Sequence, residues 1–164
     1  MAGEVHVSDD ALVTGWGLVV EAYALTAAAI RRDLLARSGL DVASFEVLLR
    51  LSRSPGQRQS ASQLAAEVSF SSGGFTKLAD RMERAGLVER IAGHQDRRMV
   101  WVTLTPAGKR TIAAAAAQHA QLLRQQVLAP LGVEDFTAMS ALMRRLRDAA
   151  SLPPTRVPEE TAWP

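Results

Sequence analysis

The sequence predicts a mainly α-helical single domain that carries one small β-ribbon. Apolar residues recur at helical spacing through most of the 164-residue chain, and the one β-rich stretch lies between Gly86 and Thr105. Hydrophobic residues make up 48% of the chain, which is enough to form a core at this length.

The first helix is expected to begin at Ser8 or Asp9, either of which can cap it. It should continue to about Arg37, because Gly39 follows in the position that commonly ends a helix. Its apolar residues recur three or four positions apart: Leu12, Val13, Trp16, Val19, Val20, Tyr23, Ala27, Ile30 and Leu34. Residues 1–8 are expected to be a flexible N-terminus.

Two shorter helices should follow. The first covers about residues 42–53 and ends at the turn sequence Ser-Pro-Gly at 54–56. The second starts at a capping box formed by Ser60 and Gln63 and ends near Val68. The tight connection that comes after it leads into a further helix.

That further helix can be capped by Ser71 or Ser72. Four apolar residues at helical spacing form one stripe that should be buried: Phe75, Leu78, Ala79 and Met82. The opposite face is then exposed and is mostly small or basic: Gly73, Thr76, Lys77, Asp80, Arg81 and Arg84. Gly86 is placed to end the helix.

A two-stranded ribbon is expected next, with strands over about residues 87–92 and 99–104 and a polar turn that holds Asp96, Arg97 and Arg98. Two short helices joined by a tight turn and followed by a basic ribbon form a winged helix-turn-helix. Such a unit can contact two grooves of duplex DNA at once.

Two long helices should complete the fold. Thr105 is an N-cap followed by proline at the first helical position, so a helix starts there and runs towards Leu128, where Ala129-Pro130 should end it. The last helix is expected from about Glu134 to Ala150. The tail at 151–164 has four prolines and is expected to be disordered.

Charge and composition exclude several function classes. Residues 56–110 carry nine Lys or Arg against five Asp or Glu, whereas the rest of the chain carries ten against twelve, so the basic segment coincides with the ribbon and its helices. Without cysteine, thiol catalysis and disulfides are excluded. The three histidines lie in different elements, so neither a metal site nor a cofactor is expected, and no catalytic constellation points to an enzyme.

The sequence also bears on location. The N-terminus lacks the basic region of a signal peptide, and the longest apolar stretches look too short or too Ala-rich to span a bilayer. The protein is therefore expected to be cytoplasmic and to have no membrane partner.

Residues near the start of the helix at 72–84 are placed to contact DNA in the major groove: Ser71, Ser72, Gly74, Thr76 and Lys77. Arg81 and Arg84, farther along the helix, suit phosphate contacts. At the ribbon tip, Arg97 and Arg98 can enter a narrow minor groove, and Asp96 can orient Arg98 through an ion pair.

Residues 40–108 resemble the MarR family of winged-helix transcriptional regulators. The resemblance rests on four stretches of sequence: Ser71-Ser72-Gly73, Asp80-Arg81-Met82-Glu83-x-x-Gly86-Leu87-Val88, Asp96-Arg97-Arg98 and Leu104-Thr105-Pro106-Ala107-Gly108. The flanking helices fit the same layout, so the resemblance extends over about residues 10–148. It implies a homodimer that binds a pseudo-palindromic operator, often represses nearby genes and often releases DNA when a small molecule binds.

The resemblance also implies how the chain is divided. A single MarR-like domain would cover residues 9–150, with the winged helix at about 41–108 and dimerisation helices at about 9–38 and 106–150. Because the chain has no cysteine, the peroxide-sensing mechanism found in one branch of the family is excluded.

A pocket for a small aromatic effector is expected where the dimerisation helices meet the winged helix. Aromatic residues on the adjoining elements favour it, with Trp16 and Tyr23 on the first helix, Phe45 on the second and Trp101 on the ribbon. Tyr23 or Arg50 would set the ligand's orientation. Two alternatives remain open: a winged-helix module that acts mainly through protein–protein contacts, and a DNA binder without an effector.

Overall fold

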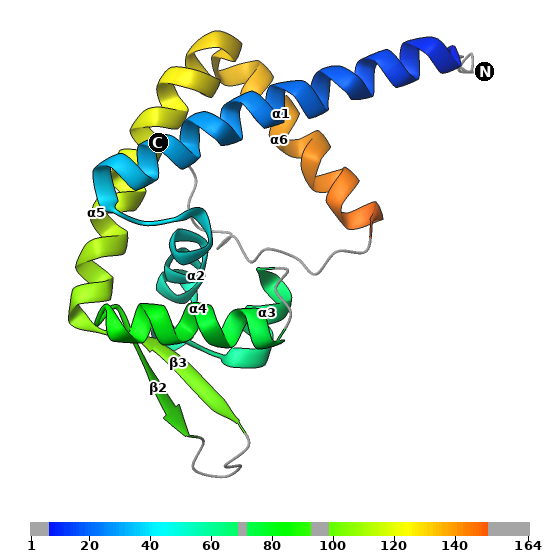
Figure 1. Ribbon diagram of the computed structural model, residues 1–164. Helices are drawn as coiled ribbons and strands as arrows, with labels where there is room; N and C mark the ends of the chain where they lie inside the picture. The colour runs from blue at the N-terminus through cyan, green and yellow to red at the C-terminus, as the bar shows by residue number, and fades with distance from the viewer. Residues whose placement is uncertain (1–6, 69–71, 93–98, 151–164) are drawn as a thin grey trace.

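In the computed structural model, which describes residues 7–68, 72–92 and 99–150, a small antiparallel sheet projects at one end of the molecule, away from the long N-terminal helix (Figure 1). In chain order the elements are α1 (Asp9–Ser38), α2 (Val42–Arg53), a 3-10 turn (Pro55–Gln57), β1 (Arg58–Ser60), α3 (Ala61–Glu67), α4 (Ser72–Arg84), β2 (Val88–Ala92), β3 (Val100–Leu104), α5 (Pro106–Leu123), a π-helical turn (Arg124–Leu128) and α6 (Ala129–Ala149).

The helix ends follow from local hydrogen bonding, as predicted. Ser8 caps α1 by accepting a hydrogen bond from the Ala11 N–H, at 3.3 Å. Gly39 closes α1 with a φ of 67°, a conformation that glycine adopts without strain. Ser60 and Gln63 form the predicted capping box at the start of α3.

The predicted two-stranded ribbon is present as β2 and β3, and a third strand that the sequence did not predict, β1, pairs with β3 to give the order β1-β3-β2. Gln59 of β1 and Arg90 of β2 both lie opposite Val102 of the central strand β3. β1 has three residues between a turn and a helix cap, which is too short to show the alternation that marks a strand. It forms because β3 offers an unpaired edge next to it.

The predicted end of the fifth helix at Ala129-Pro130 was also wrong. The chain stays helical through the π-helical turn and into α6, and the backbone breaks at Gly132, where φ is 78° and ψ is 169°. Pro130 lies in the first turn of α6, where the missing N–H costs little. The chain instead changes direction at Gly132, whose backbone conformation only glycine adopts readily.

The core lies within the winged-helix part of the chain. The predicted stripe of α4 is buried and packs with residues of α2, α3, the sheet and α5: Phe75, Leu78, Ala79, Met82, Leu48, Leu51, Leu64, Val88, Val102, Leu104 and Ile112. This packing determines which face of α4 points outward.

By contrast, α1 leaves most of its apolar side chains exposed: Leu12, Val13, Trp16, Leu18, Val19, Val20, Tyr23 and Leu25. Among the residues that the structure describes, α1 is the one helix long and apolar enough to cross a membrane, with a mean hydropathy of 1.4 over its most apolar window. The expectation that no stretch would reach this limit was therefore wrong. One such helix is weak evidence for a membrane, since helices of soluble proteins meet the same criterion.

The ribbon joins α5 through one crowded contact. Thr105 donates its hydroxyl to the Gly86 carbonyl at 2.6 Å, and the same oxygen accepts from the Gly108 N–H at 3.0 Å. A Cβ built on Gly108 would lie 2.0 Å from the Leu87 carbonyl oxygen. Only glycine fits there without a shift of the backbone.

We expect Gly108→Ala to lower the free energy of unfolding by about 3 kcal/mol, because the added methyl group overlaps backbone that cannot rotate away. Gly73→Ala is the matched control, since no atom of the described residues lies within 4 Å of its Cβ position, and it should change stability by no more than about 1 kcal/mol. Urea titration followed by circular dichroism measures both. Equal midpoints for the two variants would contradict the steric argument.

His119 of α5 is half-buried against α2. Its ring contacts Phe45 edge-on, with centroids 5.0 Å apart, and its Nδ1 has no hydrogen-bond partner among the described residues. Burial lowers the pKa of His119 below its usual 6.5, and Asp33 of α1 opposes the shift. The folded chain therefore favours neutral His119.

A group with a lowered folded pKa stabilises the fold above its unfolded pKa, and this stabilisation is lost as the pH falls. We expect the stability difference between the wild type and His119→Gln to be constant above pH 6.5 and to shrink below it. Urea titrations at a series of pH values test this. A difference that stays constant in acid would show that protonation of His119 costs the fold nothing.

Candidate nucleic-acid interface

The outward face of α4 is small and basic. Gly73, Thr76, Lys77, Arg81 and Arg84 are exposed, and Gly74 is half-buried. Ser72 is the first residue of the helix. This face lies opposite the buried stripe, as the sequence predicted. It brings together the described members of the predicted DNA-contact set on one helix.

The remaining predicted contacts cannot be placed. Ser71 and the ribbon-tip residues Asp96, Arg97 and Arg98 lie outside the described residues. Their roles in groove contact and in orienting Arg98 stay predictions from the sequence.

Arg81 has a second partner within the chain. Its guanidinium forms an ion pair with Asp41 and donates to the Ser44 hydroxyl at 3.4 Å. Asp41 also caps α2, accepting from the Ser44 N–H at 2.7 Å. Arg81 therefore connects α4 to the start of α2, whereas Arg84 donates to the Asp80 carbonyl of its own helix at 3.2 Å. Both side chains remain accessible for phosphate contact.

Arg90 joins the ribbon to α4, a contact that the sequence reasoning missed. Its guanidinium lies 2.6 Å from both Glu83 Oε2 and Asp80 Oδ1, and its backbone N–H donates to Glu83 at 3.1 Å. These hydrogen bonds lower the pKa of Glu83 and raise the pKa of Arg90. We call these three residues the wing clamp. The signal was present in the sequence as two acids three residues apart, followed by a basic residue on the adjoining strand.

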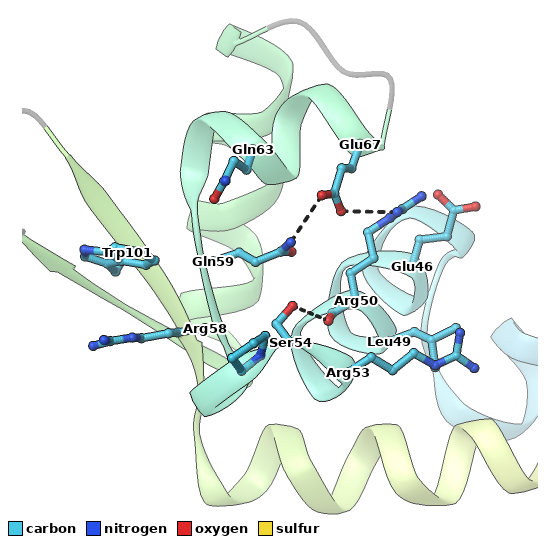
Figure 2. A pocket seen from close by; sticks show the side chains of 11 residues that line it. Glu46, Leu49, Arg50, Arg53, Ser54, Arg58, Gln59, Gln63, Glu67 and Trp101 are labelled. Atoms are coloured by element: carbon cyan, nitrogen blue, oxygen red, sulfur yellow. Dashed lines mark hydrogen bonds and ion pairs between the residues drawn. The ribbon is translucent and has the colours of Figure 1, made fainter. Parts of the chain in front are cut away.

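A cleft of about 600 Å³ lies between α2, β1, α3 and β3 (Figure 2). Arg50 and Gln59 point from opposite sides toward Glu67, each with a nitrogen 3.2 Å from one of its carboxylate oxygens. At the edge of the cleft, the guanidinium of Arg58 lies over the Trp101 ring, 5.0 Å from its centroid. The cleft thus combines an aromatic ring with a network of polar groups.

The residues predicted to form a ligand pocket do not all meet. Arg50 and Trp101 line the cleft. Trp16 and Tyr23 are exposed on α1, and Phe45 is buried in the core against His119. These three line neither this cleft nor a second one along the sheet, which Ile91, Trp101 and Thr103 help to line. Within the described part of the chain, no group of three or more metal-ligating side chains comes together.

Comparison with known proteins places this geometry in a family. Residues 40–100 match the model of the MarR family. AbsC, a MarR family transcriptional regulator from Streptomyces coelicolor, is 27% identical with a TM-score of 0.79, over 90% of this chain and 99% of that one. No curated protein matches the chain significantly.

Two less similar structures share the fold. A second MarR family regulator from S. coelicolor, solved in complex with DNA, is 24% identical with a TM-score of 0.78, covering 92% of this chain and 96% of that one. The organohalide-sensing regulator RdhR, solved with 2,4-dichlorophenol bound, is 19% identical with a TM-score of 0.72, covering 94% and 92%.

The family match spans α2 to the first residue of β3, and the likeness to AbsC adds the flanking helices. Together they show that residues 40–100 match the MarR family and that the chain as a whole is similar to MarR family transcriptional regulators.

Proposed function

We propose that the protein is a sequence-specific regulator that binds duplex DNA through α4 and the ribbon. The observation that carries this proposal is the exposed face of α4, which presents Thr76, Lys77 and Arg84 on a helix held rigidly by its buried stripe. An α-helix fits the major groove, and small residues at its start let the backbone approach the bases. The wing clamp keeps the ribbon beside this helix.

Selection of bound duplexes from a random pool tests the proposal, followed by affinity measurements over a range of salt concentrations. Neutralising several phosphates releases counterions, so the affinity should fall steeply as salt rises. A module that works mainly through protein–protein contacts would select no sequence. The same experiment therefore separates the two functions.

We further propose that the chain works as a homodimer on a pseudo-palindromic operator. The apolar side chains of α1, such as Leu12 and Trp16, are exposed to water in the single chain. A second copy of α1 would bury them against an equally apolar surface. A two-fold pair would place two α4 helices about 34–36 Å apart, one turn of DNA. This assignment also explains the hydropathy of α1 without a membrane, and it fits a cytoplasmic protein.

We propose that the regulator is a repressor whose DNA affinity is reduced by a small aromatic molecule. Repression and release by a ligand are common in the family that the sequence resembles. The cleft beside Trp101 supports a ligand of this size, because its volume lies in the range of small-molecule sites. A ligand can shift the protein away from DNA only by binding the unbound conformation more tightly.

The dimer makes a direct prediction. Sedimentation should show a dimer at micromolar concentration, and Trp16→Arg should dissociate it, because a charge would be buried in an apolar interface. Glu21→Gln, on another side of α1, is the control and should leave the dimer intact. A wild-type chain that sediments as a folded monomer would rule out the dimer.

The DNA contacts make a second prediction. Arg98→Ala should weaken operator binding by about 1–3 kcal/mol, because a desolvated groove contact is lost. Arg84→Ala should weaken binding less, similarly for all sequences, and should lower the salt slope by about one, as expected for a phosphate contact. Thr76 or Lys77 substitutions should change which DNA sequence is preferred.

Titrations of each variant with operator DNA at several salt concentrations measure the affinities and the salt slopes. Equal, salt-independent losses of affinity for the two arginine variants would contradict the assigned roles.

A further inference from the structure

Strand β2 lies at the edge of the sheet and has little apolar support. Among its residues Val88 is buried, whereas Glu89, Arg90, Ile91 and Ala92 are exposed. In the described sheet β2 has one neighbouring strand, β3. A two-stranded ribbon is only marginally stable by itself. Contacts outside the apolar core must therefore fix the direction in which the outer ribbon leaves α4.

Glu83 of α4 holds this strand through both its backbone and its side chain. Glu83 Oε1 accepts from the Arg90 backbone N–H at 3.1 Å. Glu83 Oε2 accepts from Arg90 Nε at 2.9 Å and from Arg90 Nη2 at 2.6 Å. The backbone bond covers part of the free edge of β2, where a further strand could otherwise pair. Because the bonds reach different parts of Arg90, they fix the direction of the strand as well as its distance from α4.

Arg90 also changes the charge that α4 presents. Its Nη2 lies 2.6 Å from Asp80 Oδ1 as well as from Glu83 Oε2, so one guanidinium faces two carboxylates one helical turn apart. Without Arg90, these carboxylates would repel DNA phosphates on the helix whose exposed face is otherwise basic. The guanidinium is therefore engaged within the chain, although it belongs to a basic residue of the ribbon.

We propose that Glu83 and Arg90 are positioning residues for operator binding and that neither contacts DNA. Glu83 holds the ribbon so that its tip and the start of α4 meet their grooves together, and Arg90 serves the two acids of α4 instead of a phosphate. The inference rests on the proposed function. It also reverses the sign that simple electrostatics gives: removal of an acid from the DNA-binding surface should weaken binding.

Titrations of the full-length protein with the selected duplex measure this sign. Glu83→Ala should bind roughly tenfold more weakly, comparable to the loss of one base-edge contact, because the ribbon and α4 are no longer held in register. Glu89→Ala is the matched control: Glu89 is an exposed acid next to Arg90 in the chain, and its removal changes the net charge equally. The control should bind as tightly as the wild type or more tightly, since a repulsive charge is lost.

Further readouts separate positioning from direct contact and from a damaged fold. Arg90→Gln should weaken binding to the selected duplex without changing the salt slope, whereas loss of a phosphate contact lowers that slope by about one. Glu83→Ala should bind an unrelated duplex like the wild type, because phosphate contacts carry no sequence information. Glu83→Gln keeps an acceptor for the Arg90 N–H and should retain most of the affinity that Glu83→Ala loses.

The two residues should also act as a unit. The double variant Glu83→Ala/Arg90→Gln should bind the selected duplex no more weakly than the weaker single variant. Thermal unfolding verifies that each variant is folded; if Arg90→Gln is not, the comparison of Glu83→Ala with Glu83→Gln and Glu89→Ala decides. The proposal is overturned if Glu83→Ala binds as tightly as the wild type, if Arg90→Gln lowers the salt slope by about one, or if the two losses add.

Hydrogen exchange of the Arg90 amide, measured by NMR, follows the same contact without DNA. Glu83→Ala should speed exchange at Arg90 and leave the buried Val102 amide of β3 protected. Unchanged exchange at Arg90 would show that Glu83 does not hold β2 and would overturn the proposal. If the wild type selects no duplex, the proposed function fails, whereas the exchange still decides whether Glu83 holds the ribbon. If the wild type selects a duplex that Glu83→Ala binds as Glu89→Ala does, only the positioning role is wrong.

Discussion

The close contact between Gly108 and the Leu87 carbonyl is the constraint on which the rest of the structure depends. It lets α5 begin directly against the segment that follows α4, with the Thr105 hydroxyl donating to the Gly86 carbonyl and accepting from the Gly108 N–H of α5. The residues in contact belong to the helix-turn-helix on one side and to the long helix on the other. A side chain at this position would push them apart, and the core between α2, α4 and α5 would open. One missing methyl group thus sets the direction in which α5 leaves the winged helix.

Three sets of contacts hold α4, and each has a different physical origin. Apolar burial of Phe75 and its neighbours determines the rotation of the helix about its axis. The ion pair between Arg81 and Asp41 connects it to α2, and the wing clamp connects it to β2. Exposed ion pairs add little stability singly, but their geometry restricts how the ribbon can move relative to the helix. The proposed contact with two grooves of DNA would need this kind of restriction, because both contacts must be in register with the duplex.

The molecule has two groups of apolar side chains, one buried and one exposed. The core of the winged helix is closed within one chain, whereas α1 presents large side chains such as Trp16 and Tyr23 to solvent. A helix of this composition needs a cover, and the family that residues 40–100 match consists of transcriptional regulators. That match agrees with the prediction that the chain is not an enzyme. The winged helix is thus folded around its own core, whereas the apolar face of α1 would be buried only in the proposed dimer.

The sequence by itself determined the features that arise from contacts near in the chain. Caps such as Ser8, Ser60 and Thr105 act on backbone within one turn, and the α4 stripe follows from helical spacing, so helix starts and the exposed face could be predicted. Only the tertiary structure decided β1, the break at Gly132, the wing clamp and the cleft around Glu67. Each of these depends on groups brought together from separate elements: a free strand edge, a helix continued through a proline, or a carboxylate shared by α2 and β1. The predicted effector residues illustrate the same limit, because an aromatic side chain such as Phe45 can equally fill a core, and only packing decides which.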